Sequence, residues 1–134
     1  MKATPRLSHE PRLRVLLAGR PGPASGALAA WLSDLSGATV AGLAATTVEA
    51  LAFAETSQPH VVLLDFHGLC FSTGHTVSLL KRLSPPPLVI VLTHDGSDAM
   101  RRRCRDALVD AVFDKTNELE AVAALLEDTQ KSLR

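Results

Sequence analysis

Three side chains suited to phosphoryl chemistry stand at the ends of apolar runs in this 134-residue chain. Asp65 follows the four apolar residues 61–64, Thr93 closes the stretch LVIVLT, and Lys115 closes the stretch DAVFDK. A carboxylate can act as a nucleophile that accepts a phosphoryl group. A hydroxyl and an ammonium can then bind the added oxygens, the lysine as a point charge. These residue types indicate a phosphoacceptor site, provided that the fold brings them together.

The segments around these residues alternate between expected strands and expected helices. Short apolar runs predict five strands, at 13–19, 39–45, 61–65, 88–93 and within 110–115. Helical spacing of apolar residues predicts five helices, at 24–38, 47–57, 76–84, 97–109 and 118–133. The strands are apolar runs rather than alternating patterns, which is typical of a sheet covered on both faces. The pattern therefore predicts the α/β class, a doubly wound parallel sheet with helices on both sides.

A doubly wound sheet gathers the carboxyl ends of its strands at one edge, where ligands bind. We therefore expect Asp65, Thr93 and Lys115 to converge at that edge. The same geometry explains why a buried strand ends in an acid. Asp65 lies where the strand reaches the solvent edge, and Lys115 can offset its charge.

Four local features accompany this expected fold. Thr46 or Thr47 is a suitable N-cap for the helix that follows. Gly37 suits the end of the first helix. Trp31 and Phe53 are expected in the core because aromatic side chains of this size are mostly buried.

The composition indicates one folded domain. Apolar residues make up 46% of the chain, and the formal net charge is zero, which argues against a nucleic-acid binder held by bulk charge. No apolar run approaches the roughly 20 residues of a membrane helix, and residues 1–11 lack the apolar segment of a secretory signal. We expect a cytoplasmic protein with no membrane or nucleic-acid partner. Residues 1–11 form a flexible tail in this interpretation, and residues 12–134 form the domain.

The cysteines and histidines give no metal-binding pattern. Cys70 and Cys104 are predicted to be free thiols, as is usual in a reducing compartment. A metal site that uses Cys70 with His67 or His75 lacks any Cys-x-x-Cys spacing. The stretch GRPGPASG at 19–26 fits neither a dinucleotide-binding loop nor a Walker loop.

The trio and its surroundings resemble a known family. Five βα units over about residues 12–133, with Asp65, Thr93 and Lys115 at the ends of the third, fourth and fifth strands, are similar to response-regulator receiver domains of the single-domain, chemotaxis-regulator-like type. The stretches PPPLVIVLT, RRRCRDA and FDKTNELEAV resemble a stand-alone bacterial receiver group most. The resemblance implies a flavodoxin-like sheet of order 2-1-3-4-5. It also implies a phosphorelay protein without enzymatic activity beyond its own phosphotransfer and dephosphorylation.

The resemblance also implies roles for single residues. Asp65 would be the phosphoacceptor, Thr93 the switch hydroxyl and Lys115 the lysine that pairs with the phosphate. The backbone carbonyl of His67 would ligate Mg²⁺. A histidine kinase or phosphotransfer protein would supply the phosphoryl group. A downstream protein would bind the face formed by the helix at 97–109, the strand within 110–115 and the helix at 118–133.

The sequence departs from the family where the metal should bind. The family ends its first strand with two acids that hold Mg²⁺, but this chain has Gly19 and Arg20. Mg²⁺ is usually bound through one or two carboxylates, and Asp65 is the only obvious one left. We therefore expect a weak or absent Mg²⁺ site. Arg20 is a candidate salt-bridge partner of Asp65 in place of the metal.

The switching residues differ as well. The family has an aromatic residue three positions before the lysine, and here that position holds Val112. Phe113 should face the other side of the strand because side chains alternate. The stretch Ala-Leu-Val at 107–109 also lacks the glycine that commonly ends a helix.

The chain has the phosphoacceptor trio of the family but not its two metal-binding acids, and two alternative functions follow from this. One is a phosphorylated receiver, and the alternative is a phosphorylation-independent interaction module, a pseudo-receiver. A nucleotide-binding or redox flavodoxin-like protein is a third class. The apolar residues of the helix at 118–133 could support a homodimer or could pack on the sheet.

Overall fold

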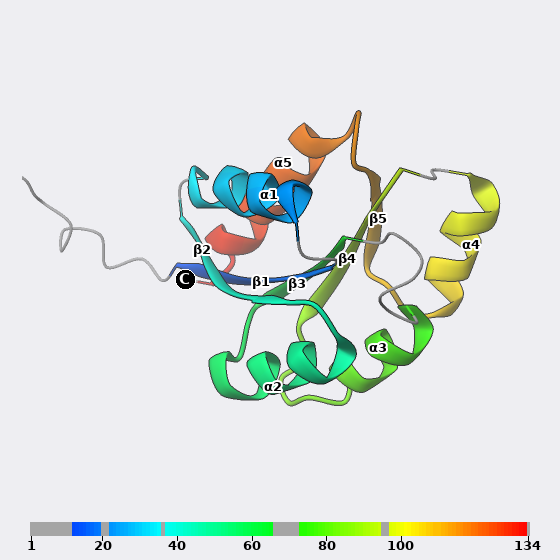
Figure 1. Ribbon diagram of the computed structural model, residues 1–134, viewed down its shortest axis with the longest axis horizontal. Helices are drawn as coiled ribbons and strands as arrows, with labels where there is room; N and C mark the ends of the chain where they lie inside the picture. Colours follow the sequence, from blue (N-terminus) through cyan, green and yellow to red (C-terminus); the bar gives the residue numbers. More distant parts are fainter. Residues whose placement is uncertain (1–11, 20–21, 36, 66–72, 95–96, 134) are drawn as a thin grey trace, which may run out of the picture.

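A five-stranded parallel sheet of order β2-β1-β3-β4-β5 forms the centre of the computed structural model, which describes residues 12–19, 22–35, 37–65, 73–94 and 97–133 (Figure 1). The strands are β1 (Leu13–Gly19), β2 (Ala38–Ala44), β3 (Val61–Asp65), β4 (Leu88–Thr93) and β5 (Ala111–Asp114). The helices are α1 (Pro23–Ser33), α2 (Thr47–Ser57), α3 (Thr73–Leu80), α4 (Asp98–Asp106) and α5 (Leu119–Lys131). The predicted fold class and strand order are confirmed.

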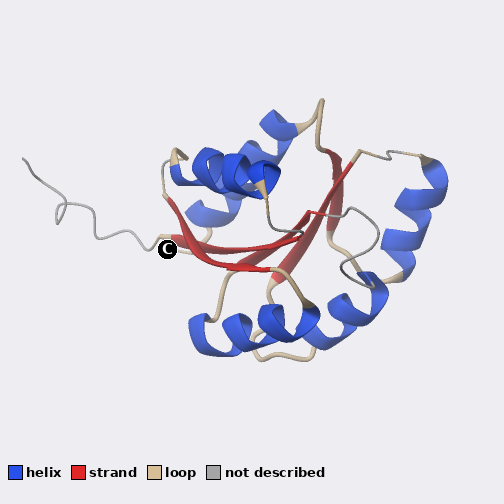
Figure 2. Cartoon of the chain, viewed as in Figure 1, coloured by secondary structure: helices blue, strands red, loops and turns tan. Residues whose placement is uncertain are grey.

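Helices cover both faces of the sheet (Figure 2). On one face, Leu28 and Leu32 of α1 and Val122 and Leu126 of α5 pack against alternate residues of β1, β3 and β4. On the other face, α2, α3 and α4 supply the buried side chains that cover the intervening residues. Because successive side chains of a strand point to opposite faces, a strand covered on both faces must be apolar throughout. This explains the apolar runs of the three central strands, which only Arg14, near the start of β1, interrupts.

The helix ends follow local hydrogen bonds. Thr46 is the N-cap of α2, since its hydroxyl accepts a hydrogen bond from the backbone N–H of Glu49. The first helix was expected to reach residue 38, but α1 ends at Ser33 because β2 already begins at Ala38. Gly37 lies in the connecting turn with φ of +85°, a conformation that favours glycine. In the described part of the chain, no helix has both the length and the hydropathy needed to cross a membrane.

Phe53 does not lie in the core, contrary to the sequence-based expectation. It is 37% exposed on α2 and covers Gly42 of the edge strand β2. A Cβ atom at residue 42 would come within 3.0 Å of the phenyl ring, so the ring uses space that only glycine leaves free. Trp31 is partly buried and packs against the core between α1, α5 and the sheet. The expectation for Trp31 is therefore confirmed in part.

Helix α4 ends in a turn that would suit glycine but contains leucine. The backbone N–H of Val109 donates to the carbonyl of Cys104, and that of Leu108 donates to the carbonyl of Arg105. This hydrogen-bond pattern is the Schellman motif, whose C′ residue adopts the left-handed conformation. Leu108 has φ of +69° and is 68% exposed. The absence of a glycine here, noted in the sequence, thus has a structural cost.

Replacing Leu108 by glycine is expected to raise the free energy of unfolding by about 1 kcal/mol, because the left-handed conformation costs about 1–2 kcal/mol for a residue with a Cβ atom. Urea denaturation followed by circular dichroism measures the change. Leu108→Ala is the matched control, since alanine also lacks the leucine side chain but keeps the strained Cβ. A gain that is as large in Leu108→Ala as in Leu108→Gly would contradict the backbone explanation.

Candidate functional site

An ion pair between Asp65 and Lys115 occupies the carboxyl edge of the sheet. The Nζ atom of Lys115 lies 2.9 Å from Oδ1 and 2.8 Å from Oδ2 of Asp65, so the ammonium binds both carboxylate oxygens. Asp65 is 3% exposed, and the side chain of Lys115 is 13% exposed. The structure therefore brings together two of the three predicted site residues in direct contact. Their burial makes each charge depend on the other, because an unpaired buried charge is costly.

Thr93 joins this pair through the neighbouring strand. It is the last residue of β4, and its side chain is buried. Its carbonyl oxygen accepts a hydrogen bond of 2.8 Å from the backbone N–H of Lys115. Strand β4 lies between β3 and β5, with Asp65 opposite Leu92 and Thr93 opposite Asp114. The ends of three adjacent strands thus place a carboxylate, a hydroxyl and an ammonium at one edge, as the sequence predicted.

A turn after β5 holds Lys115 in place. The Oδ1 atom of Asp114 accepts hydrogen bonds from the backbone N–H groups of Thr116 and Asn117 at 2.7 and 3.3 Å. These bonds, the one from Thr116 first, hold the pKa of the exposed Asp114 carboxyl below its usual value. Glu118 accepts a hydrogen bond of 2.6 Å from the backbone N–H of Asp114 through Oε1. The same oxygen lies 3.2 Å from Nη2 of Arg101 on α4. Sequence reasoning missed this support, although an acid four residues after Asp114 was visible.

Gly19 leaves no room for a side chain beside Asp65. The two residues are opposite each other in the paired strands β1 and β3. A Cβ atom at residue 19 would lie 2.9 Å from Cβ of Asp65 and 3.0 Å from its carbonyl oxygen. Distances of this size require the neighbour to move, and here the neighbour includes backbone. Glycine at this position therefore permits a close approach of Asp65 to β1.

The surroundings of Asp65 bear on the predicted Mg²⁺ site. Mg²⁺ is held through carboxylates, waters and phosphate oxygens in near-octahedral geometry. Asp65 is a carboxylate that already binds an ammonium, and no group of three or more His, Cys, Asp or Glu side chains suited to a metal occurs in the described ranges. Three residues of the sequence-based site, Arg20, His67 and Cys70, lie outside the described residues. The proposed Arg20–Asp65 salt bridge and the His67 carbonyl ligand stay predictions.

Val112 and Phe113 face opposite sides of β5. Val112 packs against the core on the α4 side, and Phe113 packs against the core on the α5 side. This confirms that Phe113 does not replace an aromatic residue at position 112. Arg101 instead approaches this position, since its Nη1 atom donates a hydrogen bond of 3.1 Å to the carbonyl oxygen of Val112.

The described histidines and cysteine have local roles apart from one another. His60 accepts a hydrogen bond of 2.8 Å from the backbone N–H of Arg14 through Nδ1. Burial, and then the charge of Arg14, lowers the pKa of His60 below its usual value, so the ring is neutral at pH 7. His94 lies 3.1 Å from the hydroxyl of Thr116. Cys104 is a buried free thiol whose pKa is raised by burial.

Comparison with known proteins identifies the class of fold. The sequence matches no protein-family model and no curated protein. Solved structures match it in fold. A DNA-binding response regulator of the LuxR family from Staphylococcus aureus has a TM-score of 0.76 with 14% identity, and the match covers 88% of this chain and 98% of that one.

Two further structures extend the range of proteins with this fold. The receiver domain of a sensor histidine kinase from Pseudomonas aeruginosa, whose structure has a magnesium ion in the active-site cleft, has a TM-score of 0.75 with 18% identity over 90% of this chain and 98% of that one. A Burkholderia pseudomallei protein named as pilus assembly-related has a TM-score of 0.77 with 17% identity over 92% of this chain and 93% of that one. The chain therefore has the fold of receiver domains.

Proposed function

We propose that this chain is a receiver domain of two-component signal transduction with Asp65 as its phosphoacceptor. The observation that carries the proposal is the arrangement at the carboxyl edge of the sheet. A buried Asp65 ends β3, a buried Thr93 ends the next strand, and Lys115 reaches both carboxylate oxygens. A sheet edge of this kind, in a fold shared with solved receiver domains, supports a phosphoacceptor role over a mere strand-end acid.

The phosphoryl transfer itself can be written for these residues. A carboxylate oxygen of Asp65 attacks the phosphorus of a phosphohistidine on a histidine kinase or phosphotransfer protein. The P–N bond breaks, and the electron pair returns to the imidazole, which takes up a proton as it leaves. Lys115 and the Thr93 hydroxyl then bind the added phosphoryl oxygens. The Lys115 ammonium lowers the nucleophilicity of the two carboxylate oxygens that it binds, which would slow the transfer.

Receiver chemistry normally depends on a cation, and the proposal includes an impaired cation site. Gly19 and Arg20 replace the expected acids, and the space for a side chain at residue 19 is taken up by Asp65. Without a cation, the developing charge on the phosphoryl group is less well neutralised. We therefore propose slow phosphorylation that depends only weakly on Mg²⁺.

Addition of acetyl phosphate or beryllofluoride, with and without millimolar Mg²⁺, tests the proposal. Intact-mass measurement should show a gain of one phosphoryl group, and amide NMR shifts should centre on Asp65, Thr93 and Lys115. Asp65→Asn is the control variant, because it keeps the side-chain shape but removes the nucleophile. Absence of both the mass gain and the shifts would reject the phosphoacceptor.

One observation favours a second function, a phosphorylation-independent interaction module. Lys115 already neutralises Asp65 on both oxygens, so the site resembles a completed ion pair. In this case the folded domain would bind its partner in one fixed state, through the face of α4, β5 and α5. Partner binding that is equal for the wild type and Asp65→Asn, in a protein that takes up no phosphoryl group, would support this alternative.

A further inference from the structure

We propose that two copies of this chain form a two-fold dimer by antiparallel pairing of their β2 strands. The starting observation is that the sheet has two unequal edges. β5 has only four residues. β2 has seven residues, ATVAGLA, with neither charge nor proline. Edge strands are commonly protected from pairing by shortness, charge, proline or a bulge, and of these β2 has only a bulge, at Ala41.

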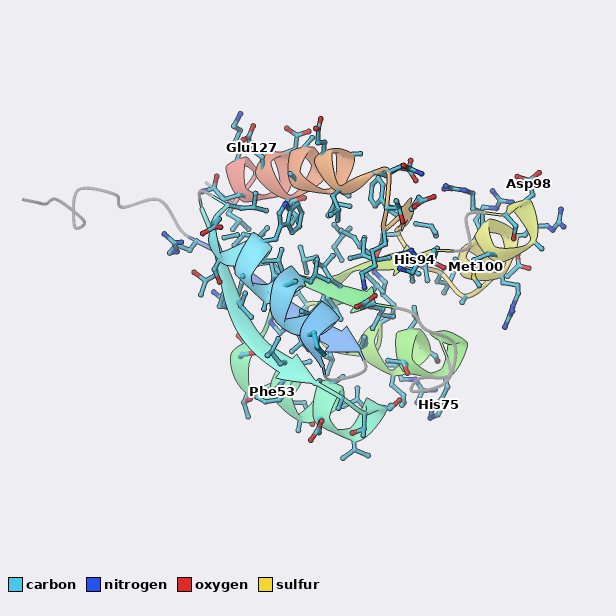
Figure 3. The ribbon with its side chains drawn as sticks, turned by 45° about the horizontal axis from the view of Figure 1, so that its top comes forward. Phe53, His75, His94, Asp98, Met100 and Glu127 are labelled. Carbon is cyan, nitrogen blue, oxygen red and sulfur yellow. The ribbon has the colours of Figure 1, made fainter. Side chains whose placement is uncertain are left out.

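Exposed apolar side chains surround the β2 edge. Four large apolar residues are exposed in the described part of the chain, and three of them lie on β2 or α2: Leu43 (50%), Val48 (76%) and Phe53 (37%). Figure 3 shows Phe53 beside β2. A cavity of about 220 Å³ lies between Leu43 and the start of α1, next to Gly22 and Gly26. Phe53 covers the face of β2 on which residue 42 lies, and Leu43 points to the opposite face, so exposed apolar side chains flank this edge on both sides, as at sites of protein contact.

Opposite charges stand at the two ends of β2. At its start, Arg12 donates hydrogen bonds to the hydroxyl of Thr39 and to the carbonyl of Ala38. At its end, Glu49 accepts a hydrogen bond from the backbone N–H of Ala45. Antiparallel pairing places the start of one strand beside the end of the other. Each Arg12 would then lie near Glu49 of the second copy, giving two opposite-charge contacts per dimer.

The middle of β2 is compatible with this symmetry. A bulge interrupts its pairing with β1, since Val15 pairs with Val40 but Leu16 pairs with Gly42. Segments of equal length, 38–40 and 42–44, lie on either side of Ala41. A two-fold axis near Ala41 pairs the first segment of one copy with the second segment of the other, although the bulge limits the number of ladder hydrogen bonds.

These features favour a second copy over an unrelated partner. A two-fold contact uses the same patch on both subunits, so the patch must complement itself. The β2 edge does so, because its centre is uncharged and its ends are opposite in charge. Helix α5 is a weaker candidate for self-association, since Val122 and Leu126 are buried in the core. Asp65 ends β3 and Lys115 follows β5, both away from β2, so the dimer would not require phosphorylation.

Sedimentation equilibrium over a concentration series of the full chain tests the dimer. The wild type should approach twice the monomer mass of 14.2 kDa at high concentration. Leu43→Lys should raise the dimer dissociation constant at least about tenfold, because an edge lysine opposes strand pairing. Leu108→Lys is the matched control, since it adds the same charge at an exposed leucine far from β2 and should leave the constant unchanged. A monomer at every concentration, or equal effects of both variants, would overturn the proposal.

Charge reversal tests the antiparallel orientation. Arg12→Glu and Glu49→Lys should each raise the dimer dissociation constant about tenfold, because each places two like charges side by side in the dimer. The double variant should restore the wild-type constant, because it pairs opposite charges again. Circular dichroism checks folding, since Glu49 also caps α2. Amide hydrogen exchange gives an independent readout in the wild type, with slower exchange of residues 39–43 as the concentration rises. Failure of the double variant to regain the dimer while folded, or concentration-independent exchange at 39–43, would overturn the pairing.

Discussion

Replacing Lys115 by methionine is expected to lower the free energy of unfolding by about 3 kcal/mol at pH 7, since breaking a buried ion pair leaves an uncompensated charge. Methionine keeps most of the length of the lysine side chain, so the loss reports chiefly on the ammonium. That ammonium lies within 2.9 Å of both oxygens of Asp65, which is almost fully buried. Urea denaturation followed by tryptophan fluorescence and circular dichroism measures the change.

Two further variants separate the ion pair from other effects. Lys131→Met removes an exposed lysine that pairs with Glu127 one helical turn away, and it should change the free energy of unfolding by less than about 0.5 kcal/mol. Asp65→Asn combined with Lys115→Met should recover part of the loss, because no charge then stays buried. If Lys115→Met and Lys131→Met destabilise the chain equally, the buried pair contributes no more than a surface pair.

Introducing an acid at residue 19 is expected to destabilise the fold rather than simply restore a metal site. Gly19→Asp should lower the free energy of unfolding by about 2 kcal/mol, in the range observed for overpacked sites. The cause is steric, because the new Cβ would meet Asp65 at 2.9 Å and its carbonyl at 3.0 Å. The second carboxylate also adds like-charge repulsion beside Asp65. Urea denaturation measures the total loss of stability from steric overlap and charge repulsion. Repeating it with Mg²⁺ shows how much of the charge repulsion a bound cation relieves.

Matched glycine variants isolate the steric part. Gly19→Ala adds the Cβ without the carboxylate and should account for most of the loss. Gly26→Ala is the control, since a Cβ there meets no atom within 4 Å and alanine is the better helix former, so stability should hold or rise by up to about 1 kcal/mol. Wild-type stability of Gly19→Ala would show that Asp65 moves aside freely, and the close approach would then not explain the missing acid.

The fold was predictable because its signals are local. The apolar runs of the three central strands have two covered faces, so the pattern in the sequence corresponds directly to burial. The convergence of Asp65, Thr93 and Lys115 followed from the rule that parallel strands bring their carboxyl ends to one edge. The helix ends were less predictable, as α1 shows, because they depend on where the next strand starts.

Features that depend on contacts between strands were not visible in the sequence. The close approach of Gly19 to Asp65 depends on the register of β1 and β3. The exposure of Phe53 depends on a glycine in the neighbouring strand, which lets the ring lie flat on β2 instead of inside the core. The left-handed Leu108 likewise became evident only from the backbone, because leucine gives no turn signal.

The strand order has a consequence for the time course of folding. β1 pairs on one side with β2 and on the other with β3, so Val15 contacts both Val40 and Val61. The strand nearest the start of the chain therefore cannot complete its pairing until residue 65 is available. Contacts between residues far apart in sequence require the chain to lose loop-closure entropy before the contacts contribute favourable free energy. Parallel sheets fold slowly for this reason. During synthesis, the apolar β1 must wait for β3 to complete its pairing and for α5 to cover one of its faces.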